Sequence, residues 1–365
     1  MAQSRFSRKI IGRVLVYSLA AVLAIAAVVV YKAAVAPSRS PFGVGFFESG
    51  RYQYQANHET AYEPKPGFTG VSDLSEPKTY ITYDRLGARV DGPGRESTDP
   101  VYLMTVGCSQ SWGQGVENGQ TFTSILGTIL EKPVVNFSVS GYGGVGSLLR
   151  LRQHINLKPK VIVYAFWEDH FNRNLNRCSA TGSPVCLEMP RVQFGPGATP
   201  TIKISSHATR NLELTRMWYL EASGLSDKYR TFWTDLYWSG YALWRSVEKE
   251  YSQATGHPEE PQDENKVNAT NYVLGQMKLT ASEVSAQLLV VYIPLYFDDA
   301  IRQVPEAVRA SAEQQGIQLI DMAERLRGMR AAGVPLAIPG DGHMTAAVHA
   351  AIADEVVSRL THLGL

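Results

Sequence analysis

The sequence has few cysteines, almost no net charge and no internal repeat. Its three cysteines form no cluster with histidine at the spacing of a zinc site, so no metal is indicated. The formal net charge is +1, and six basic residues among the first 40 leave the rest of the chain at −5. That sign is wrong for a protein that binds a phosphate backbone. We therefore expect no nucleic-acid partner.

The residues that are abundant are apolar: 44% are hydrophobic and 19% are charged, which suits one large or two small globular domains. The longest apolar stretch, Val14 to Tyr31, carries no charge and with its flanks approaches the ~20 residues of a spanning helix. Ala34-Val35-Ala36 also looks like a signal-peptide cleavage site, but Pro37 would follow the cut directly. We predict a cytoplasmic basic tail over 1–13, a transmembrane helix over 14–35 and an exported remainder.

In an exported domain, the cysteines can be oxidised. Cys178 and Cys186 flank a short loop with Gly182 and Pro184, and we predict that they form a disulfide. Cys108 is left over, and we expect it to be a small buried residue beside a strand end.

Residues 36–100 are expected to form a stalk and then an extended lead-in. The first part is rich in Gly, Pro, Tyr and Phe without a sustained period. Thr79 to Tyr83 is a candidate edge strand. This segment would hold the following domain away from the membrane.

From Val101 onward, apolar runs alternate with helical patterns. The apolar runs are continuous, as in a parallel sheet covered on both faces, and their spacing fits right-handed crossovers. We expect a three-layer α/β/α sandwich with a five-stranded parallel sheet over 101–365. The predicted strands are Tyr102–Val106, Val134–Val139, Val161–Phe166, Gln287–Ile293 and Ile317–Asp321, and the predicted helices are Thr121–Glu131, Val145–Ile155, Asp299–Gln314, Met322–Arg330 and Met344–Leu360.

An insertion at about 172–282 interrupts this alternation. Its aromatic residues recur at helical offsets within Met217–Glu248, which favours amphipathic helices packed on the domain. A cap that lines a sugar or acyl site is the alternative. Residues 259–268 are expected to form a charged loop.

Ser109 follows the first predicted strand on a turn of small residues, and a helical pattern comes next. A serine becomes a nucleophile when a base accepts its proton, and His343 lies in a turn with Asp341 two residues earlier. By itself, Asp341-Gly342 would indicate an ordinary turn at the start of the last helix. These residues all fall at the carboxyl edge of the predicted sheet, where ligands bind. Ser111 is a competing hydroxyl, but a serine in a first helical turn usually bonds to the backbone.

Four segments in this order resemble the sequence blocks of the SGNH/GDSL hydrolase superfamily: Gly107–Val116, Asn136–Gly143, Trp167–Asp169 and Asp341–His343. The resemblance covers about residues 101–365. It implies a flavodoxin-like sandwich and a Ser/His/Asp esterase or acyltransferase. It also implies that Ser109 is the nucleophile, His343 the base and Asp341 its orienting group, and that the N–H groups of Ser109 and Gly141 bind the oxyanion.

Two residues depart from the pattern of this superfamily. Cys108 stands where the first block usually has aspartate, and Glu168 stands where the third block usually has an asparagine that donates to the oxyanion. An ionised carboxylate would repel an oxyanion. The alternatives are that a protonated Glu168 donates or that a later residue replaces it: Asn172, Arg173 or Asn174. The neighbouring His170 is expected to be structural.

The leading hypothesis is therefore an inner-membrane, single-pass protein whose periplasmic domain hydrolyses or transfers short acyl groups, above all acetyl, on a cell-envelope glycan. Trp112, Trp167 and Arg173 are candidate substrate contacts, and a membrane acyl-donor protein is a candidate partner. This chemistry requires no cofactor. The alternatives are a lipid esterase or thioesterase, and a catalytically silent binding or scaffold protein of the envelope.

Overall fold

The computed structural model describes residues 53–72, 79–92, 94, 96–97, 100–177, 188–204, 263–296, 301–339 and 341–365. The predicted transmembrane helix, the Cys178 and Cys186 pair and the aromatic stretch of the insertion lie outside these residues. Among the helices of the described ranges, none has the length and apolar character needed to cross a membrane.

A five-stranded parallel sheet lies at the centre of the described chain. Its strands are β5 (Leu103–Val106), β6 (Val134–Asn136), β7 (Val161–Trp167), β10 (Gln287–Ile293) and β11 (Gln318–Asp321). They lie in the order β11-β10-β7-β5-β6 and all neighbouring pairs are parallel. Numbered along the chain, this is the 2-1-3-4-5 order of flavodoxin-like sheets. The predicted α/β fold with a five-stranded parallel sheet is confirmed.

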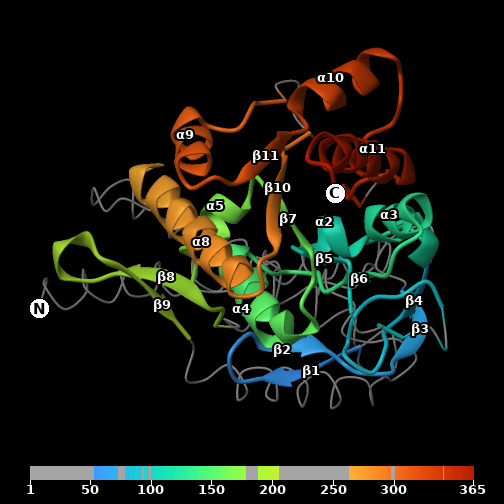
Figure 1. Cartoon of the computed structure of the whole chain (residues 1–365), viewed down its shortest axis with the longest axis horizontal. Coiled ribbons are helices and arrows are strands. Elements are labelled where there is room, and N and C mark those ends of the chain that lie inside the picture. The colour runs from blue at the N-terminus through green and yellow to red at the C-terminus, as the bar shows by residue number, and fades with distance from the viewer. Residues whose placement is uncertain are drawn as a thin grey trace, which may run out of the picture. The chain divides into compact units, whose positions relative to one another are not determined.

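The sheet is covered by helices on both faces because successive side chains of its strands point to opposite sides. In β7, Ile162, Tyr164 and Phe166 belong to one apolar cluster, and Val161, Val163 and Ala165 belong to the other. Helices α4 (Gly144–His154), α8 (Asp263–Glu283) and α9 (Glu306–Gln314) contribute to the first cluster, and α3 (Phe122–Leu130), α10 (Ala323–Ala331) and α11 (Ala346–His362) to the second. In Figure 1, α8 and α9 lie to the left of the sheet and α3 and α11 to its right.

Most predicted elements are present, but two boundaries differ. Strand β6 ends at Asn136 instead of Val139, because the backbone of Phe137 to Val139 continues into a loop beside Gly107. Helix α9 begins at Glu306 instead of Asp299, with Pro305 at its N-cap in an extended conformation. Proline has no N–H and commonly stands at a helix start, so the helix cannot continue through it undisturbed.

The prediction of a charged loop at 259–268 is wrong for its second half. Helix α8 begins at Asp263 and provides the crossover between β7 and β10. Ala269, Val273, Met277 and Ala281 recur every four residues and are buried in the first cluster. Polar residues between these positions made the helical pattern difficult to recognise in the sequence. The insertion also contains a two-stranded hairpin of β8 (Arg191–Phe194) and β9 (Pro200–Lys203).

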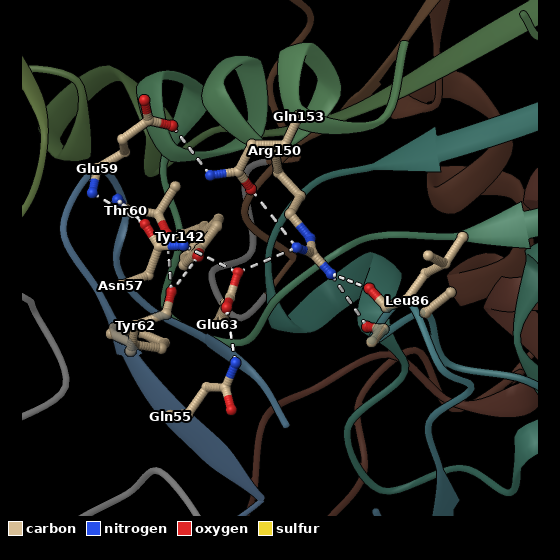
Figure 2. A network of polar contacts seen from close by, with 12 residues as sticks. Gln55, Asn57, Glu59, Thr60, Tyr62, Glu63, Leu86, Tyr142, Arg150 and Gln153 are labelled. Carbon is tan, nitrogen blue, oxygen red and sulfur yellow. Dashed lines mark hydrogen bonds and ion pairs between the residues drawn. The ribbon is translucent and has the colours of Figure 1, made fainter. Parts of the chain in front are cut away.

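The lead-in is not an extended stalk where the structure describes it. It forms two antiparallel pairs, β1 (Tyr54–Asn57) with β2 (Ala61–Pro64) and β3 (Thr69–Ser72) with β4 (Thr79–Thr82). The predicted edge strand is thus β4, but it pairs with β3 and not with the central sheet. Polar contacts join the β1–β2 hairpin to α4: Glu63 to Arg150 at 3.4 Å and Glu59 to Gln153 at 3.0 Å (Figure 2).

Candidate active site

Ser109 is the first residue of α2 (Ser109–Trp112), a single helical turn that begins three residues after the end of β5. Cys108 before it is extended, and Gly113 after it is left-handed with φ 92°. Gly107 has no room for a side chain, because an added Cβ would collide with Ser111 Oγ and lie 3.0 Å from the Ala165 carbonyl oxygen. The small residues of this turn therefore place a serine at the carboxyl edge of the sheet.

The structure brings Ser109, His343 and Asp341 together, although 234 residues separate the serine and the histidine. His343 Nε2 lies 2.8 Å from Ser109 Oγ. The other ring nitrogen, Nδ1, lies 2.5 Å from Asp341 Oδ1, which also accepts the His343 backbone N–H at 3.1 Å. Such an arrangement lets a carboxylate hold an imidazole so that its free nitrogen faces a hydroxyl.

Asp341 is suited to remain ionised. Burial by itself would raise the pKa of this carboxyl group, but hydrogen bonds and positive charge from His343, together with a hydrogen bond from Gln114, lower it below its ordinary value. Gln114 Nε2 donates to Asp341 Oδ2 at 3.1 Å. The carboxylate thus has partners on both oxygens, which fixes its orientation toward the imidazole.

Three side chains that the sequence did not single out hold the histidine loop in place. Gln110 Oε1 accepts from the Tyr296 hydroxyl at 2.8 Å and from the Met344 backbone N–H at 3.1 Å. The Tyr296 hydroxyl also lies 3.1 Å from the Gly342 carbonyl oxygen. With Gln114, these contacts anchor the loop before and after His343. The position of Gln110 and Gln114 within the serine segment was the only signal for them.

Gly141 lies in the loop that follows β6, next to the serine turn. Val139 N–H donates to the Gly107 carbonyl at 3.1 Å, and Tyr142 N–H turns back to the Val139 carbonyl at 3.2 Å. Gly141 itself is buried with φ 85°, a conformation that favours glycine. Within the described residues its N–H donates no hydrogen bond, so it is free to serve a ligand.

The two carboxylates of the third segment have different partners. Glu168 Oε2 accepts the Leu295 backbone N–H at 2.7 Å, which occupies this carboxylate oxygen at the end of β10. Asp169 pairs with Arg173 at 2.6 Å, and Arg173 Nη1 donates to the Tyr142 carbonyl at 3.0 Å. Arg173 therefore connects the third segment to the Gly141 loop.

The candidate replacements for the missing asparagine differ in their contacts. The Asn172 amide donates to Asp169 Oδ1 at 3.2 Å, and the Asn174 amide donates to Thr270 Oγ1 at 3.1 Å. Both amides are thus used within the protein. Arg173, which already reaches the Tyr142 carbonyl, is the one of the three that touches the Gly141 loop through its side chain.

The two candidate tryptophans have different environments. Trp112 is 1% exposed and packs with Phe68, Ile81 and Tyr83, so the prediction that it contacts substrate is wrong. These residues of the lead-in cover it. Trp167 is partly exposed at the end of β7, with the Arg173 guanidinium 4.8 Å from its ring centroid. It remains a candidate contact.

Two further polar residues near the site are structural, as expected. Ser111 is buried and its hydroxyl donates to the Cys108 carbonyl at 3.1 Å. His170 is fully buried against the Tyr164 hydroxyl at 2.7 Å, and burial followed by the charge of Arg173 holds its pKa well below the ordinary value.

Arg89 of the lead-in supports the serine turn from the opposite end. Its buried guanidinium donates to the carbonyls of Trp112, Gly113 and Val116 at 2.8, 2.5 and 2.6 Å. These backbone oxygens lie at and after the end of α2, where carbonyl groups have no partner within the helix. Burial lowers the pKa of Arg89 to about 10.

In the described part of the chain, no group of three or more His, Cys, Asp or Glu side chains is placed to hold a metal ion.

The strand order and the contacts of Ser109, His343 and Asp341 are those that the SGNH/GDSL resemblance implies, whereas Glu168 and Cys108 depart from its pattern. No family model and no curated protein matches the sequence. Similar solved structures include TesA, at 18% identity over 72% of this chain and 99% of that chain with a TM-score of 0.38. The esterase EstA from Pseudoalteromonas sp. is 11% identical over 72% and 97% of the two chains, with a TM-score of 0.36. The acetylxylan esterase Axe2 from Geobacillus stearothermophilus is 10% identical over 74% and 97%, with a TM-score of 0.38. These values describe a remote likeness, and the assignment of function depends on the chain's own residues.

Proposed function

We propose that this chain is an SGNH-type serine esterase or acyltransferase. The observation that carries the proposal is the pair of hydrogen bonds from Asp341 through His343 to Ser109, at 2.5 and 2.8 Å. A hydroxyl, an imidazole and a carboxylate in this order are what acyl transfer through serine requires.

In the proposed reaction, Ser109 Oγ attacks the carbonyl carbon of the ester while His343 Nε2 accepts its proton. The N–H groups of Ser109 and Gly141 bind the oxyanion that forms. His343 then returns the proton to the leaving alcohol as the C–O bond breaks, which leaves an acyl group on Ser109. A water or an acceptor hydroxyl then attacks that acyl group and gives its proton to His343. His343 returns this proton to Ser109 Oγ as the bond between Oγ and the acyl carbon breaks.

The proposed substrate is a short acyl ester, above all acetyl, on a cell-envelope glycan. This part rests on the predicted export of the domain and on Trp167, a partly exposed aromatic side chain beside Arg173 that would contact a sugar. The predicted anchor over 14–35 would place the site in the periplasm, at the outer face of the inner membrane. A membrane acyl-donor protein would supply the acyl group if the reaction is a transfer.

The test is hydrolysis of p-nitrophenyl acetate and p-nitrophenyl dodecanoate by the full chain in detergent, beside Ser109→Ala. We expect acetate to be the better substrate and Ser109→Ala to lower kcat at least about 1000-fold. Ser282→Ala on the exposed side of α8 is the control, and it should retain activity within about threefold because its hydroxyl donates to the Lys278 carbonyl of the same helix, at 2.8 Å.

Each other outcome assigns a different function. Preference for the long ester would favour a lipid esterase or thioesterase. Activity that survives Ser109→Ala would exclude the proposed centre. If hydrolysis is absent but a glycan acceptor and an acyl donor together restore turnover, the enzyme is a transferase. Absence of turnover in every arm would leave a binding protein of the envelope.

A further inference from the structure

The β1–β2 hairpin of the lead-in packs directly against the loop that carries Gly141. Tyr54, Ala61 and Tyr62 of the hairpin form one buried cluster with Val139 and Tyr142 of the loop. The Tyr62 and Tyr142 rings meet edge to face, with centroids 5.4 Å apart. A segment expected to be a stalk thus packs against the loop that carries Gly141.

Two hydroxyl contacts join this hairpin and this loop in opposite directions. The Tyr62 hydroxyl donates to the Ser140 carbonyl at 2.7 Å, and the Tyr142 hydroxyl donates to the Tyr62 carbonyl. Figure 2 shows Tyr62 and Tyr142 side by side among the polar contacts between the hairpin and α4. Tyr62, Ser140 and Tyr142 are all buried. Burial, and next the neighbouring Tyr142, raise the pKa of Tyr62, so its hydroxyl keeps the proton that it donates.

The Ser140 carbonyl and the Gly141 N–H belong to the same peptide unit. A trans peptide is planar, and its C=O and N–H point in opposite directions. A hydrogen bond that fixes the Ser140 carbonyl therefore also fixes the direction of the Gly141 N–H. Gly141 has φ 85° and no side chain, so its backbone has little intrinsic preference that would hold this peptide by itself.

We propose that Tyr62 is a positioning residue, which orients the Gly141 N–H toward the oxyanion through its hydrogen bond to the Ser140 carbonyl. The inference rests on the proposed function, since it concerns the oxyanion donor of that site. It assigns the lead-in a role in catalysis that the SGNH segments alone do not contain. Glu63, next to Tyr62 in the hairpin, contacts Arg150 of α4 at 3.4 Å, and Arg150 Nη2 in turn donates to the Leu86 carbonyl at 2.8 Å (Figure 2). These contacts fix the hairpin beside Tyr62.

The test compares Tyr62→Phe with Tyr142→Phe in the full chain. Each variant keeps a buried ring and removes one hydroxyl of the same interface, but only Tyr62→Phe releases the Ser140–Gly141 peptide. The Tyr62 carbonyl still accepts from Thr60 Oγ1 at 3.0 Å in the control variant. Both variants should lower the melting temperature to a similar extent, because each loses one buried hydrogen bond.

The expected difference lies in kcat for p-nitrophenyl acetate. Loss of one oxyanion donor costs about 100- to 1000-fold in kcat, so a donor that is present but less well oriented should cost about 10- to 100-fold. KM should change less than about threefold, because the oxyanion exists only in the transition state. Tyr142→Phe should retain kcat within about threefold. Equal kcat for the two variants, or an effect of Tyr62→Phe on KM alone, would overturn the inference.

A crystal structure of Tyr62→Phe separates this inference from the proposed function. We expect the Ser140–Gly141 peptide to rotate away from its present direction in that variant and to stay in place in Tyr142→Phe. An unrotated peptide in Tyr62→Phe would overturn the inference even if the enzyme is a serine esterase. Conversely, hydrolysis that is insensitive to Ser109→Ala would remove the proposed function, whatever the peptide does.

Discussion

Ser109 and His343 meet because the loop around the histidine is held at several points. Gln114 holds Asp341, the Tyr296 hydroxyl contacts the Gly342 carbonyl, and Gln110 accepts the Met344 N–H. These contacts hold the Asp341-Gly342 turn, and with it the His343 ring, in one orientation. The lowered pKa of Asp341 keeps a negative charge beside His343 Nδ1 at neutral pH, which stabilises the imidazolium that forms when Ser109 gives up its proton.

Asp341→Asn tests this arrangement. The amide preserves the size of the side chain but loses the charge and can present an N–H to Nδ1, so the ring tends toward the wrong tautomer. We expect kcat for p-nitrophenyl acetate to fall about 1000- to 10,000-fold with the fold intact. Asp354→Asn on the exposed side of α11 is the control and should leave kcat unchanged. If Asp341→Asn keeps most of its activity, the carboxylate does not orient the base.

The element that presents the serine is one turn of helix, α2, between β5 and a left-handed glycine. Such a short helix has little stability of its own, since nucleation of a helical turn is unfavourable. Its position comes from its surroundings. Gly107 permits close contact with β7, Ser111 bonds back to the Cys108 carbonyl, and Arg89 binds the carbonyl oxygens at the far end.

Gly107→Ala should therefore destabilise the protein and displace the serine. The added methyl would overlap Ser111 Oγ, and such overpacking costs about 1–3 kcal/mol of the free energy of unfolding. Gly328→Ala in α10 is the control, and its expected effect on stability has the opposite sign. An added Cβ there has no heavy atom within 4 Å, and alanine should raise the free energy of unfolding by about 0.5–1 kcal/mol. Thermal unfolding of both variants measures the contrast, and a Gly107→Ala protein as stable as the wild type would refute the close contact.

At the scale of the described molecule, the lead-in and the sheet form one packed unit with buried ionisable groups. His170 and His349 are fully buried, and each is paired through Nδ1: His170 with the Tyr164 hydroxyl and His349 with the Phe122 N–H. Burial, the first cause for both, lowers the pKa of His349 to about 3 and that of His170 well below 6.5. Both histidines stay neutral in the folded protein at pH values where the unfolded chain binds protons.

The stability of the protein should therefore fall as the pH falls below about 6.5. In this range the unfolded chain binds more protons than the native protein, so the free energy of unfolding decreases by up to about 1.4 kcal/mol per pH unit for each buried histidine. His349→Asn can still accept the Phe122 N–H but does not titrate. Between pH 6 and 4, the free energy of unfolding of His349→Asn should therefore change less steeply with pH than that of the wild type, by up to about 1.4 kcal/mol per pH unit. Denaturant unfolding at several pH values measures both slopes, and equal slopes would contradict the prediction.

The sequence by itself determined the elements whose signals are local. Continuous apolar runs predicted the five parallel strands, because a strand buried on both faces needs apolar residues at every position. The small-residue turn before a helix indicated Ser109, and the Asp341-Gly342-His343 turn indicated the candidate base. Each of these signals lies within a few residues of the feature that it predicts.

Only the tertiary structure decided which distant residues share an environment. Trp112 was a candidate substrate contact, but lead-in residues about 30 to 45 positions earlier bury it. The lead-in looked like a spacer, yet Tyr62 and Arg89 contact the loops around Ser109 and Gly141. Helix α8 was not apparent in the sequence because polar residues, including the buried Thr270 and Thr280, lie between the apolar residues that pack in the first cluster. The contacts that bury or orient these side chains join residues far apart along the chain, and no local pattern encodes such a contact.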